Sequence, residues 1–226
     1  MQEYTATVRD IQFITEKDLT LSLELNQAEF TFTPGQFVQF KVGDVFRSYS
    51  ITSLPSQLPQ LDFLIELIDE GVASTFIKNL KIGDSVTFRG SLGVMTAKPD
   101  IASYFFIATG VGIAPFRSII ASVLDEDSKK SITLLFGAGT AKRIFYHEEF
   151  KMFESKFNQF KYYPTITREQ WHGIHGRVTE HLDMLYEGHQ NDAFYLCGGV
   201  TAVNDVRNQL LTLGHDPKHI KLEIFT

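Results

Sequence analysis

The 226-residue sequence predicts two domains, an N-terminal antiparallel β-barrel and a C-terminal α/β domain with a doubly wound parallel sheet. Apolar and polar residues alternate with period two in the first part of the chain, as in half-buried strands. Continuous apolar runs separated by helical patterns follow, as in strands buried on both faces. The pattern changes at Lys98-Pro99-Asp100. We therefore expect one domain over 1–98 and the other over 99–226.

Short strands joined by turns are expected in the first domain. The clearest spans 19–25, where leucines alternate with Thr20, Ser22 and Glu24. Similar runs cover 37–42, 61–68 and 86–89, and they are separated by turn residues at Pro34-Gly35, Pro55-Ser56 and Gly83-Asp84. The segment 72–80 lacks alternation and predicts one short helix. Several short strands at this spacing are typical of a small antiparallel barrel.

The second domain is expected to alternate strands with helices. Apolar runs over 104–108, 132–136 and 193–196 predict buried strands, with further strands over 161–166 and 222–225. Two helical faces lie among them, at Phe116, Ile119, Ile120, Val123 and Leu124, and at Val203, Val206, Leu210 and Leu213. Strand–helix alternation predicts a parallel sheet, and ligands bind such sheets beyond the carboxyl ends of the strands.

Composition excludes several classes of function. The formal net charge of -6 argues against a nucleic-acid partner, because neutralising phosphates needs clustered basic residues. No apolar run approaches the roughly 20 residues of a membrane span, and residues 1–5 lack the features of a signal peptide, so we expect a cytoplasmic protein. The single cysteine, Cys197, excludes an iron–sulfur cluster held by the chain's own thiolates. The seven histidines show no metal-ligand spacing, so no metal is expected.

Arg47-Ser48-Tyr49-Ser50 is the first candidate site. Arg47 and Tyr49 are two residues apart in a predicted strand, so their side chains share one face. Such a pair suits a ligand with a phosphate for the guanidinium and a flat ring for the phenol. Ser50 would point to the opposite side in an ideal strand, but its backbone and hydroxyl could still reach a ring edge where the strand bends. An exposed arginine beside a packed barrel tyrosine is the simpler alternative.

Gly71-Val72-Ala73-Ser74 opens the predicted short helix. A helix N-terminus offers free backbone N–H groups and binds phosphate. The alternative is an ordinary helix start capped by Ser74. Two phosphate-binding elements in one small barrel favour FAD or FMN as its ligand.

Thr109-Gly110-Val111-Gly112, followed by Pro115, joins a buried strand to a helix. The glycines permit a tight turn and close approach of a phosphate, and proline suits the first turn of a helix. Proline stands where the dinucleotide fingerprint has its third glycine. The pattern therefore favours a nicotinamide nucleotide that binds reversibly.

Three further segments complete the candidate site. Cys197-Gly198 ends a predicted strand where a nucleotide would bind, although a lone cysteine is usually a packing residue. Thr167-Arg168 and Arg177 follow another strand and could bind a ribose phosphate. The alternative is that they belong to a solvated loop. Phe225 lies in the last predicted strand, where core packing is its simplest role.

With these motifs the chain resembles the ferredoxin–NADP reductase superfamily over essentially its whole length. The resemblance implies a barrel that binds FAD, or FMN, and an α/β domain that binds NAD(P)H. It implies that Arg47 contacts the flavin phosphates, that Tyr49 stacks on the isoalloxazine and that Ser50 lies near the flavin N5. It also matches three sets of residues to family motifs: Gly71 and Ser74 to the second phosphate motif; Gly110, Gly112 and Pro115 to the nucleotide turn; and Cys197 and Gly198 to the segment flanking the nicotinamide.

Glu223 and Phe225 resemble the terminal acid-x-aromatic element of the family, in which the aromatic ring covers the flavin face that nicotinamide must occupy. Thr167-Arg168-Glu169 resembles the segment that binds the 2′-phosphate of NADPH, whereas Gly139 stands where some bacterial members carry another basic residue. The resemblance therefore favours NADPH only weakly over NADH.

We expect hydride transfer from NAD(P)H to the flavin, followed by release of electrons to a separate acceptor. Ser50, Cys197 and Glu223 would line the transfer site, with Glu223 as a proton relay. The expected acceptor is a ferredoxin, a flavodoxin or an oxygenase component. The alternatives are a flavin reductase that releases reduced flavin, and a non-catalytic flavin-binding redox protein.

Overall fold

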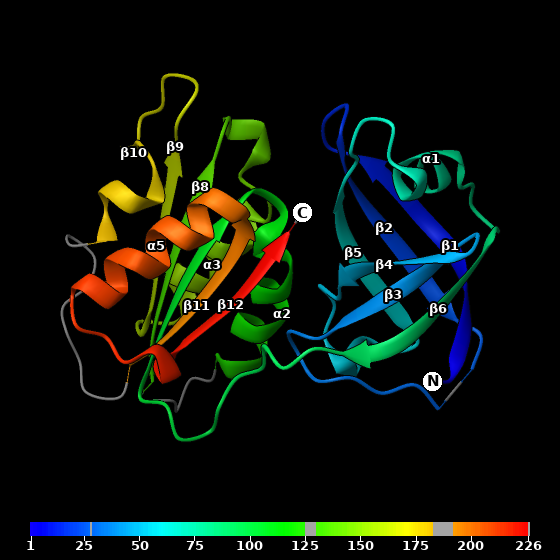
Figure 1. Cartoon of the computed structure of the whole chain (residues 1–226), viewed down its shortest axis with the longest axis horizontal. Coiled ribbons are helices and arrows are strands. Elements are labelled where there is room, and N and C mark those ends of the chain that lie inside the picture. Colours follow the sequence, from blue (N-terminus) through cyan, green and yellow to red (C-terminus); the bar gives the residue numbers. More distant parts are fainter. Residues whose placement is uncertain (28, 125–129, 183–191, 226) are drawn as a thin grey trace. The chain divides into compact units, whose positions relative to one another are not determined.

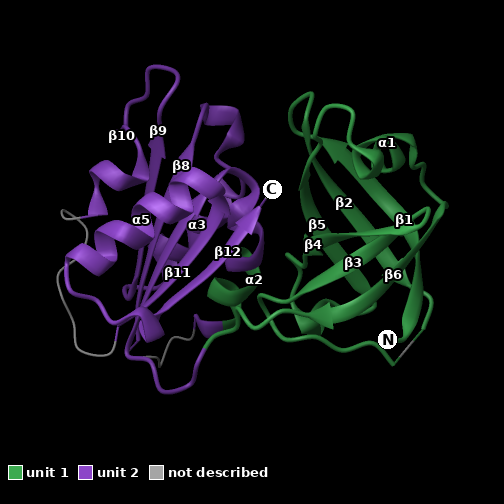
Figure 2. Cartoon of the chain, viewed as in Figure 1, with its two compact units in different colours: residues 1–97, 117–122 green, residues 98–116, 123–226 purple. Residues whose placement is uncertain are grey.

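A computed structural model of the chain describes residues 1–27, 29–124, 130–182 and 192–225. The chain forms two compact units, shown in Figure 2. Unit 1 contains Met1–Ala97 together with Arg117–Ser122. Unit 2 contains Lys98–Phe116 and Val123–Thr226.

Unit 1 is built on a six-stranded antiparallel sheet with the strand order β4-β3-β6-β1-β2-β5. These strands are labelled in Figure 1. A bridge between Ile51, directly after β4, and Phe63 in β5 links the two edges, so the sheet closes on itself. The predicted antiparallel barrel is thereby confirmed. Its strands are β1 (Glu3–Phe13), β2 (Asp18–Leu25), β3 (Phe37–Val42), β4 (Val45–Ser50), β5 (Gln60–Glu66) and β6 (Ser85–Leu92).

Alternation in the sequence decides which face of each barrel strand is buried. In β2, Leu19, Leu21 and Leu23 are fully buried while the residues between them are half-buried. The predicted helix is α1 (Val72–Asn79), which buries Ala73 and Ile77 in the same core. β5 ends at Glu66, two residues before the predicted limit, because the chain turns toward α1 and leaves Ile68 exposed.

Residues 117–122 group with unit 1 through buried polar contacts. Ser118 is fully buried, and its Oγ accepts a hydrogen bond from the Gly35 amide at 3.1 Å and donates to the Ile51 carbonyl at 3.1 Å. Arg117 donates from Nη1 to the Thr52 carbonyl at 2.8 Å. A buried hydroxyl with both roles satisfied is stabilising, whereas the same group without partners would be costly.

Unit 2 is built on a six-stranded parallel sheet with the order β10-β9-β8-β7-β11-β12. Its strands are β7 (Ser103–Thr109), β8 (Ser131–Ala138), β9 (Phe160–Ile166), β10 (Ile174–His175), β11 (Asp192–Gly199) and β12 (Ile220–Phe225). The order reverses between β7 and β11, because the chain builds outward to β10 from β7 and then returns to the other side. The predicted doubly wound fold is confirmed.

Helices cover both faces of this sheet. On one face, α5 (Val200–Thr212) packs Val203, Val206 and Leu210 against β7, β8 and β11. On the other face, α2 (Ala114–Val123) places Phe116 5.0 Å from Phe106 of β7, measured between ring centroids. There α3 (His147–Lys156) packs Phe150 against β9.

Two details of the helices differ from the sequence prediction. Leu213 is half-exposed, since α5 ends at Thr212 before another turn can bury it, and Leu124 lies beyond the end of α2. The charged helix α3 was not predicted, because its apolar side is narrow. Among the described residues no helix is both long and apolar enough to cross a membrane.

Candidate functional site

Strand β4 presents Arg47 and Tyr49 on one side, as predicted. Tyr49 pairs with Val38 and Arg47 with Phe40, so both side chains leave on the side where β3 carries buried residues. The Tyr49 ring lies 4.7 Å from the Phe40 ring, and burial raises the pKa of its phenol to about 12. Arg47 is exposed and donates from Nη1 to the Phe46 carbonyl at 3.0 Å. A neutral, half-buried ring beside an exposed guanidinium suits a flat ligand that carries phosphate.

Ser48 and Ser50 lie on the opposite side of β4. Ser48 is exposed and its Oγ accepts a hydrogen bond from Gln39 Nε2 at 3.2 Å. Ser50 is buried at 6% exposure, at the point where the strand ends. The structure thus separates the two serines from the Arg47–Tyr49 pair, as the alternation of side chains in a strand requires.

The first turn of α1 has the features of a phosphate cradle. Glu70 adopts a positive φ of 58° and Gly71 is the N-cap, so the amides of Val72 and Ala73 open the helix without intrahelical acceptors. A β-carbon on Gly71 would lie 3.1 Å from the Ile68 carbonyl oxygen, a tighter contact than most β-carbons make. Ser74 makes no capping bond. Its Oγ accepts instead from the Ile68 amide at 2.7 Å.

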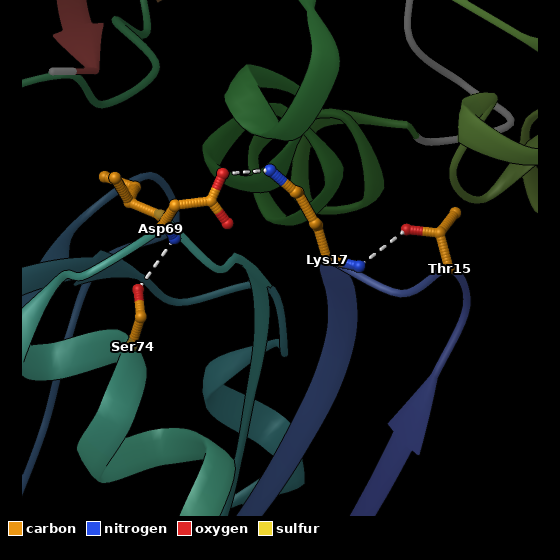
Figure 3. Close-up of polar contacts among 5 residues, drawn as sticks. Thr15, Lys17, Asp69 and Ser74 are labelled. Atoms are coloured by element: carbon orange, nitrogen blue, oxygen red, sulfur yellow. Dashed lines mark hydrogen bonds and ion pairs between the residues drawn. The ribbon is translucent and has the colours of Figure 1, made fainter.

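A hollow of about 340 Å³ lies beside this turn, between α1 and the segment that joins β1 to β2. The Lys17 ammonium bonds Asp69 at 2.5 Å across it, and Thr15 accepts from the Lys17 amide at 3.2 Å (Figure 3). Its lining carries two lysines and three carboxylates, so the side chains alone give no net attraction for phosphate. The residues are Glu16, Lys17, Leu67, Ile68, Asp69, Glu70, Ser74, Thr75, Lys78 and Asn79.

In unit 2 the predicted nucleotide turn joins β7 to α2. Thr109 ends the strand, the next four residues form a single 3₁₀ turn, and Pro115 lies in the first turn of α2. Gly110 has a φ of +54°, a conformation that favours glycine. The turn directs backbone amides beyond the carboxyl end of the sheet, where α/β proteins bind phosphate.

Gly112 and the Cys197–Gly198 segment pack against each other. A β-carbon on Gly112 would collide with the Cys197 carbonyl and lie 2.6 Å from the Gly198 amide nitrogen. Gly198 has a φ of +149° and packs against Thr109 in the same way. The structure therefore brings two predicted segments, 85 residues apart in the chain, into backbone contact at the strand order reversal.

Cys197 and Glu223 are direct neighbours on the parallel strands β11 and β12. The thiol is 1% exposed, and burial, with the Glu223 carboxylate as a second cause, raises the pKa of Cys197 well above its ordinary value. Burial also raises the pKa of Glu223 to about 7. Two residues further on, Phe225 pairs with Gly199 and is half-buried.

The predicted ribose-phosphate residues lie at neighbouring strand ends. Thr167 and Arg168 follow β9, their amides donate to the Ala138 and Gly139 carbonyls, and the Arg168 side chain crosses Gly139. Arg177 follows β10, whose last residue pairs with the last residue of β9. Thr167, Arg168 and Arg177 are exposed. Exposure fits both of the predicted alternatives, a ribose-phosphate site and a solvated loop.

Two basic residues near these sites were missed from the sequence. Lys17 and Asp69 are 52 residues apart in the chain, and they meet beside Ser74 because an antiparallel pairing joins β2 to β5. Arg143, in the 3₁₀ turn Ala141–Arg143, places its guanidinium beside Gly110. Neither stands in a motif, so only the fold reveals its position.

Two family models match the chain in the order of its units. The oxidoreductase FAD-binding domain matches residues 5–96, and the oxidoreductase NAD-binding domain matches residues 106–208. The chain therefore contains a domain of the FAD-binding family followed by a domain of the NAD-binding family.

Relatives with similar sequences include reductases and electron transfer components. The anthranilate 1,2-dioxygenase electron transfer component of Acinetobacter baylyi is 27% identical over 90% of this chain and 61% of its own length. Ferredoxin–NADP reductase B of Sorangium cellulosum is 29% identical over 86% of this chain and 85% of its own. The toluate 1,2-dioxygenase electron transfer component of Pseudomonas putida is 26% identical over 98% of this chain and 67% of its own. The chain thus spans about two thirds or less of the length of both dioxygenase components.

Solved structures share the fold. An Amycolatopsis cytochrome P450 reductase, GcoB, superimposes with a TM-score of 0.91 at 23% identity, covering all of this chain and 70% of that one. A ferredoxin–NADP reductase from Neisseria gonorrhoeae, with bound FAD and NADP, gives 0.86 at 21% identity over 99% of each chain. The two family models together define an oxidoreductase of the flavin and nicotinamide type. The chain belongs to the oxidoreductases that carry these FAD-binding and NAD-binding domains, and its sequence is similar to that of a ferredoxin–NADP reductase.

Proposed function

We propose that this protein is an NAD(P)H-dependent flavoprotein reductase that passes electrons to a separate acceptor. The observation that carries the proposal is the placement of an FAD-binding domain and an NAD-binding domain in one chain, with the motif residues on the elements that suit them. We assign residues 1–98 and 99–226 to these two domains. When bound, the flavin accepts hydride from the nicotinamide and releases electrons singly or in pairs.

The barrel residues fit FAD. Tyr49 offers a half-buried ring held against Phe40, and Arg47 offers an exposed guanidinium on the same side of β4. The amides that open α1 supply a second phosphate-binding element. In this assignment Arg47 and the Gly71–Ser74 turn hold the phosphates, Tyr49 stacks on the ring system, and the Ser48–Ser50 end of the strand borders it.

The α/β residues fit a nicotinamide nucleotide. We assign the phosphates of the nucleotide to the turn formed by Gly110, Gly112 and the start of α2, and its nicotinamide to the adjoining backbone of Thr109, Cys197 and Gly198. Arg168 and Arg177 are exposed at the next strand ends, where a ribose 2′-phosphate would meet them. We therefore propose NADPH as the preferred donor.

Glu223 is the group suited to handle a proton. Burial raises the pKa of its carboxyl to about 7, so both protonation states are populated near neutral pH. Cys197 beside it remains a thiol, because burial raises its pKa. We assign to Cys197 the packing of the transfer site and to Glu223 the holding or transfer of a proton.

For the acceptor we propose a small redox protein or an oxygenase component. Relatives of this chain are named as electron transfer components of the anthranilate and toluate dioxygenases, and one as a ferredoxin reductase. The chain has a single cysteine, so an iron–sulfur cluster on the path to an oxygenase would need ligands from elsewhere. A ferredoxin is one carrier that supplies them.

The visible spectrum of the purified protein tests this function. Under anaerobic conditions, addition of NADPH is expected to bleach the flavin band faster than addition of NADH. A yellow protein that neither donor bleaches would refute the proposal in favour of a non-catalytic flavin-binding protein. A colourless protein that reduces added free flavin would instead identify a flavin reductase.

A further inference from the structure

Arg143 lies at the phosphate turn of unit 2, although it follows a different strand. It ends the 3₁₀ turn Ala141–Arg143 after β8, whereas the phosphate turn follows β7. A β-carbon placed on Gly110 would lie 3.7 Å from Nη2 of Arg143, in ordinary van der Waals contact. The guanidinium is thus next to the glycine that begins the phosphate turn.

The loop that carries Arg143 is fixed by hydrogen bonds to the loop that follows β9. The Ala141 amide donates to Glu169 Oε1 at 2.6 Å, and the Arg168 amide donates to the Gly139 carbonyl at 2.9 Å. Within the 3₁₀ turn the Arg143 amide donates to the Thr140 carbonyl at 3.0 Å. The base of the Arg143 side chain therefore has a defined position.

Arg143 and its neighbour Lys142 have different surroundings. Lys142 is exposed, whereas Arg143 is half-buried with its guanidinium carbon 5.9 Å from the centre of the Phe145 ring. A partly desolvated guanidinium with a planar donor fork binds phosphate oxygens in pairs. The backbone amides of the adjacent turn supply further donors to the same anion.

We propose that Arg143 binds the pyrophosphate of the nicotinamide nucleotide and therefore contributes equally to the affinity for NADH and NADPH. The inference rests on the proposed function of unit 2. It gives Arg143 a different role from Arg168, whose side chain crosses Gly139 and which we assign to the 2′-phosphate. One arginine sets affinity for both donors and the other sets preference between them.

Two nucleotide fragments separate these roles. ADP-ribose carries the pyrophosphate without a 2′-phosphate, and 2′-AMP carries the 2′-phosphate without a pyrophosphate. Binding of each to the flavin-loaded protein is measured by calorimetry at about 0.15 M salt, where exposed charges are screened beyond about 8 Å. Arg143→Gln is expected to weaken ADP-ribose about tenfold or more, the loss typical of a charge-assisted hydrogen bond, and to leave 2′-AMP within about twofold.

Three further variants make the result specific. Lys142→Gln removes an exposed neighbouring charge and is expected to change neither fragment by more than about twofold. Arg168→Gln is expected to weaken 2′-AMP and leave ADP-ribose nearly unchanged. Arg143→Lys keeps the charge without the fork, so its affinity for ADP-ribose is expected between those of wild type and Arg143→Gln.

Steady-state kinetics supply the second readout. Arg143→Gln is expected to raise KM for NADH and NADPH by the same factor. Unchanged ADP-ribose binding in Arg143→Gln, with wild-type flavin reduction, would overturn the role of Arg143 and leave the proposed function intact. Equal loss of both fragments would overturn it in favour of a structural role for the loop. Failure of the wild-type protein to bind either fragment, with no bleaching by NAD(P)H, would refute the proposed function itself.

Discussion

Gly112 lies directly against the carbonyl of Cys197, so that the turn after β7 and the end of β11 share one backbone contact. This contact leaves no space for a β-carbon at position 112. It holds two of the proposed nucleotide-binding segments against each other, so that neither can shift without moving the other.

Gly112→Ala is expected to destabilise unit 2 by about 1–3 kcal/mol, the typical cost of overpacking a tight contact. Trp171, the single tryptophan of the chain, lies in unit 2 and reports its unfolding in urea. The matched control is Gly199→Ala, because a β-carbon there meets no atom within 4 Å and the φ of −66° suits any residue. Equal urea midpoints for the two variants would contradict this account of Gly112.

Glu223 is expected to make stability fall as the pH rises. Below pH 4.5 its carboxyl is largely protonated in both the folded and the unfolded chain. Between pH 4.5 and about 7 the unfolded chain ionises it freely while the folded chain resists, because burial raises the folded pKa. The loss of stability is complete above about pH 7 and amounts to at most about 3 kcal/mol in the free energy of unfolding.

The variant Glu223→Gln isolates this contribution. The free energy of unfolding is measured for wild type and Glu223→Gln at about pH 4.5, 6 and 8. With rising pH the wild type is expected to lose stability relative to the variant. A difference that stays constant over this range would show that the Glu223 carboxyl has its ordinary pKa.

How much could be predicted from the sequence depended on whether the signal was local. Alternating leucines over 19–25 identified the buried face of β2, and glycines with proline at 110–115 located a turn between strand and helix. The helix α3 was missed because its outer residues are mostly charged and few apolar residues mark its buried side. Local periodicity therefore sufficed for most of the strands that the structure describes, although β1 and β10 were not predicted.

Contacts between distant segments could not be predicted in this way. Arg143 stands in no motif, and its position beside Gly110 follows from the parallel pairing of β7 with β8, which places the following loops together. Ser74 was one candidate for the helix cap, but Gly71 is the N-cap and the Ser74 Oγ accepts a hydrogen bond from the Ile68 amide. Such contacts depend on the tertiary fold rather than on residue spacing.

Cys197 is expected to resist thiol reagents in the folded protein. Its side chain is 1% exposed and burial raises its pKa, so little thiolate forms and a reagent has no access. Addition of a chromogenic disulfide reagent at about pH 8 is expected to modify the protein only at the rate at which unit 2 opens, and completely in urea. Stoichiometric modification within seconds under native conditions would contradict the burial of the thiol.

Cys197→Ala is expected to retain the flavin but to slow its reduction by NADPH. The proposed flavin residues belong to unit 1, whereas Cys197 lies in the proposed nicotinamide crevice of unit 2. Stopped-flow absorbance separates the two effects, since flavin content is read before mixing and the rate after it. Wild-type reduction kinetics would remove the thiol from the transfer site.

Tyr49→Ala is expected to lower flavin affinity about fivefold or more, because stacking alone contributes about 1 kcal/mol beyond the burial of the ring area. Tyr49→Phe keeps the ring that packs against Phe40, and it is expected to retain flavin nearly as well as wild type. The pair of variants distinguishes the ring from the hydroxyl, whose pKa of about 12 already excludes a role as an anion near neutral pH. Flavin content after dialysis, read from the visible spectrum against protein concentration, measures the effect. Full retention of flavin by Tyr49→Ala would show that the ligand does not stack on this ring and would move the proposed flavin site away from β4.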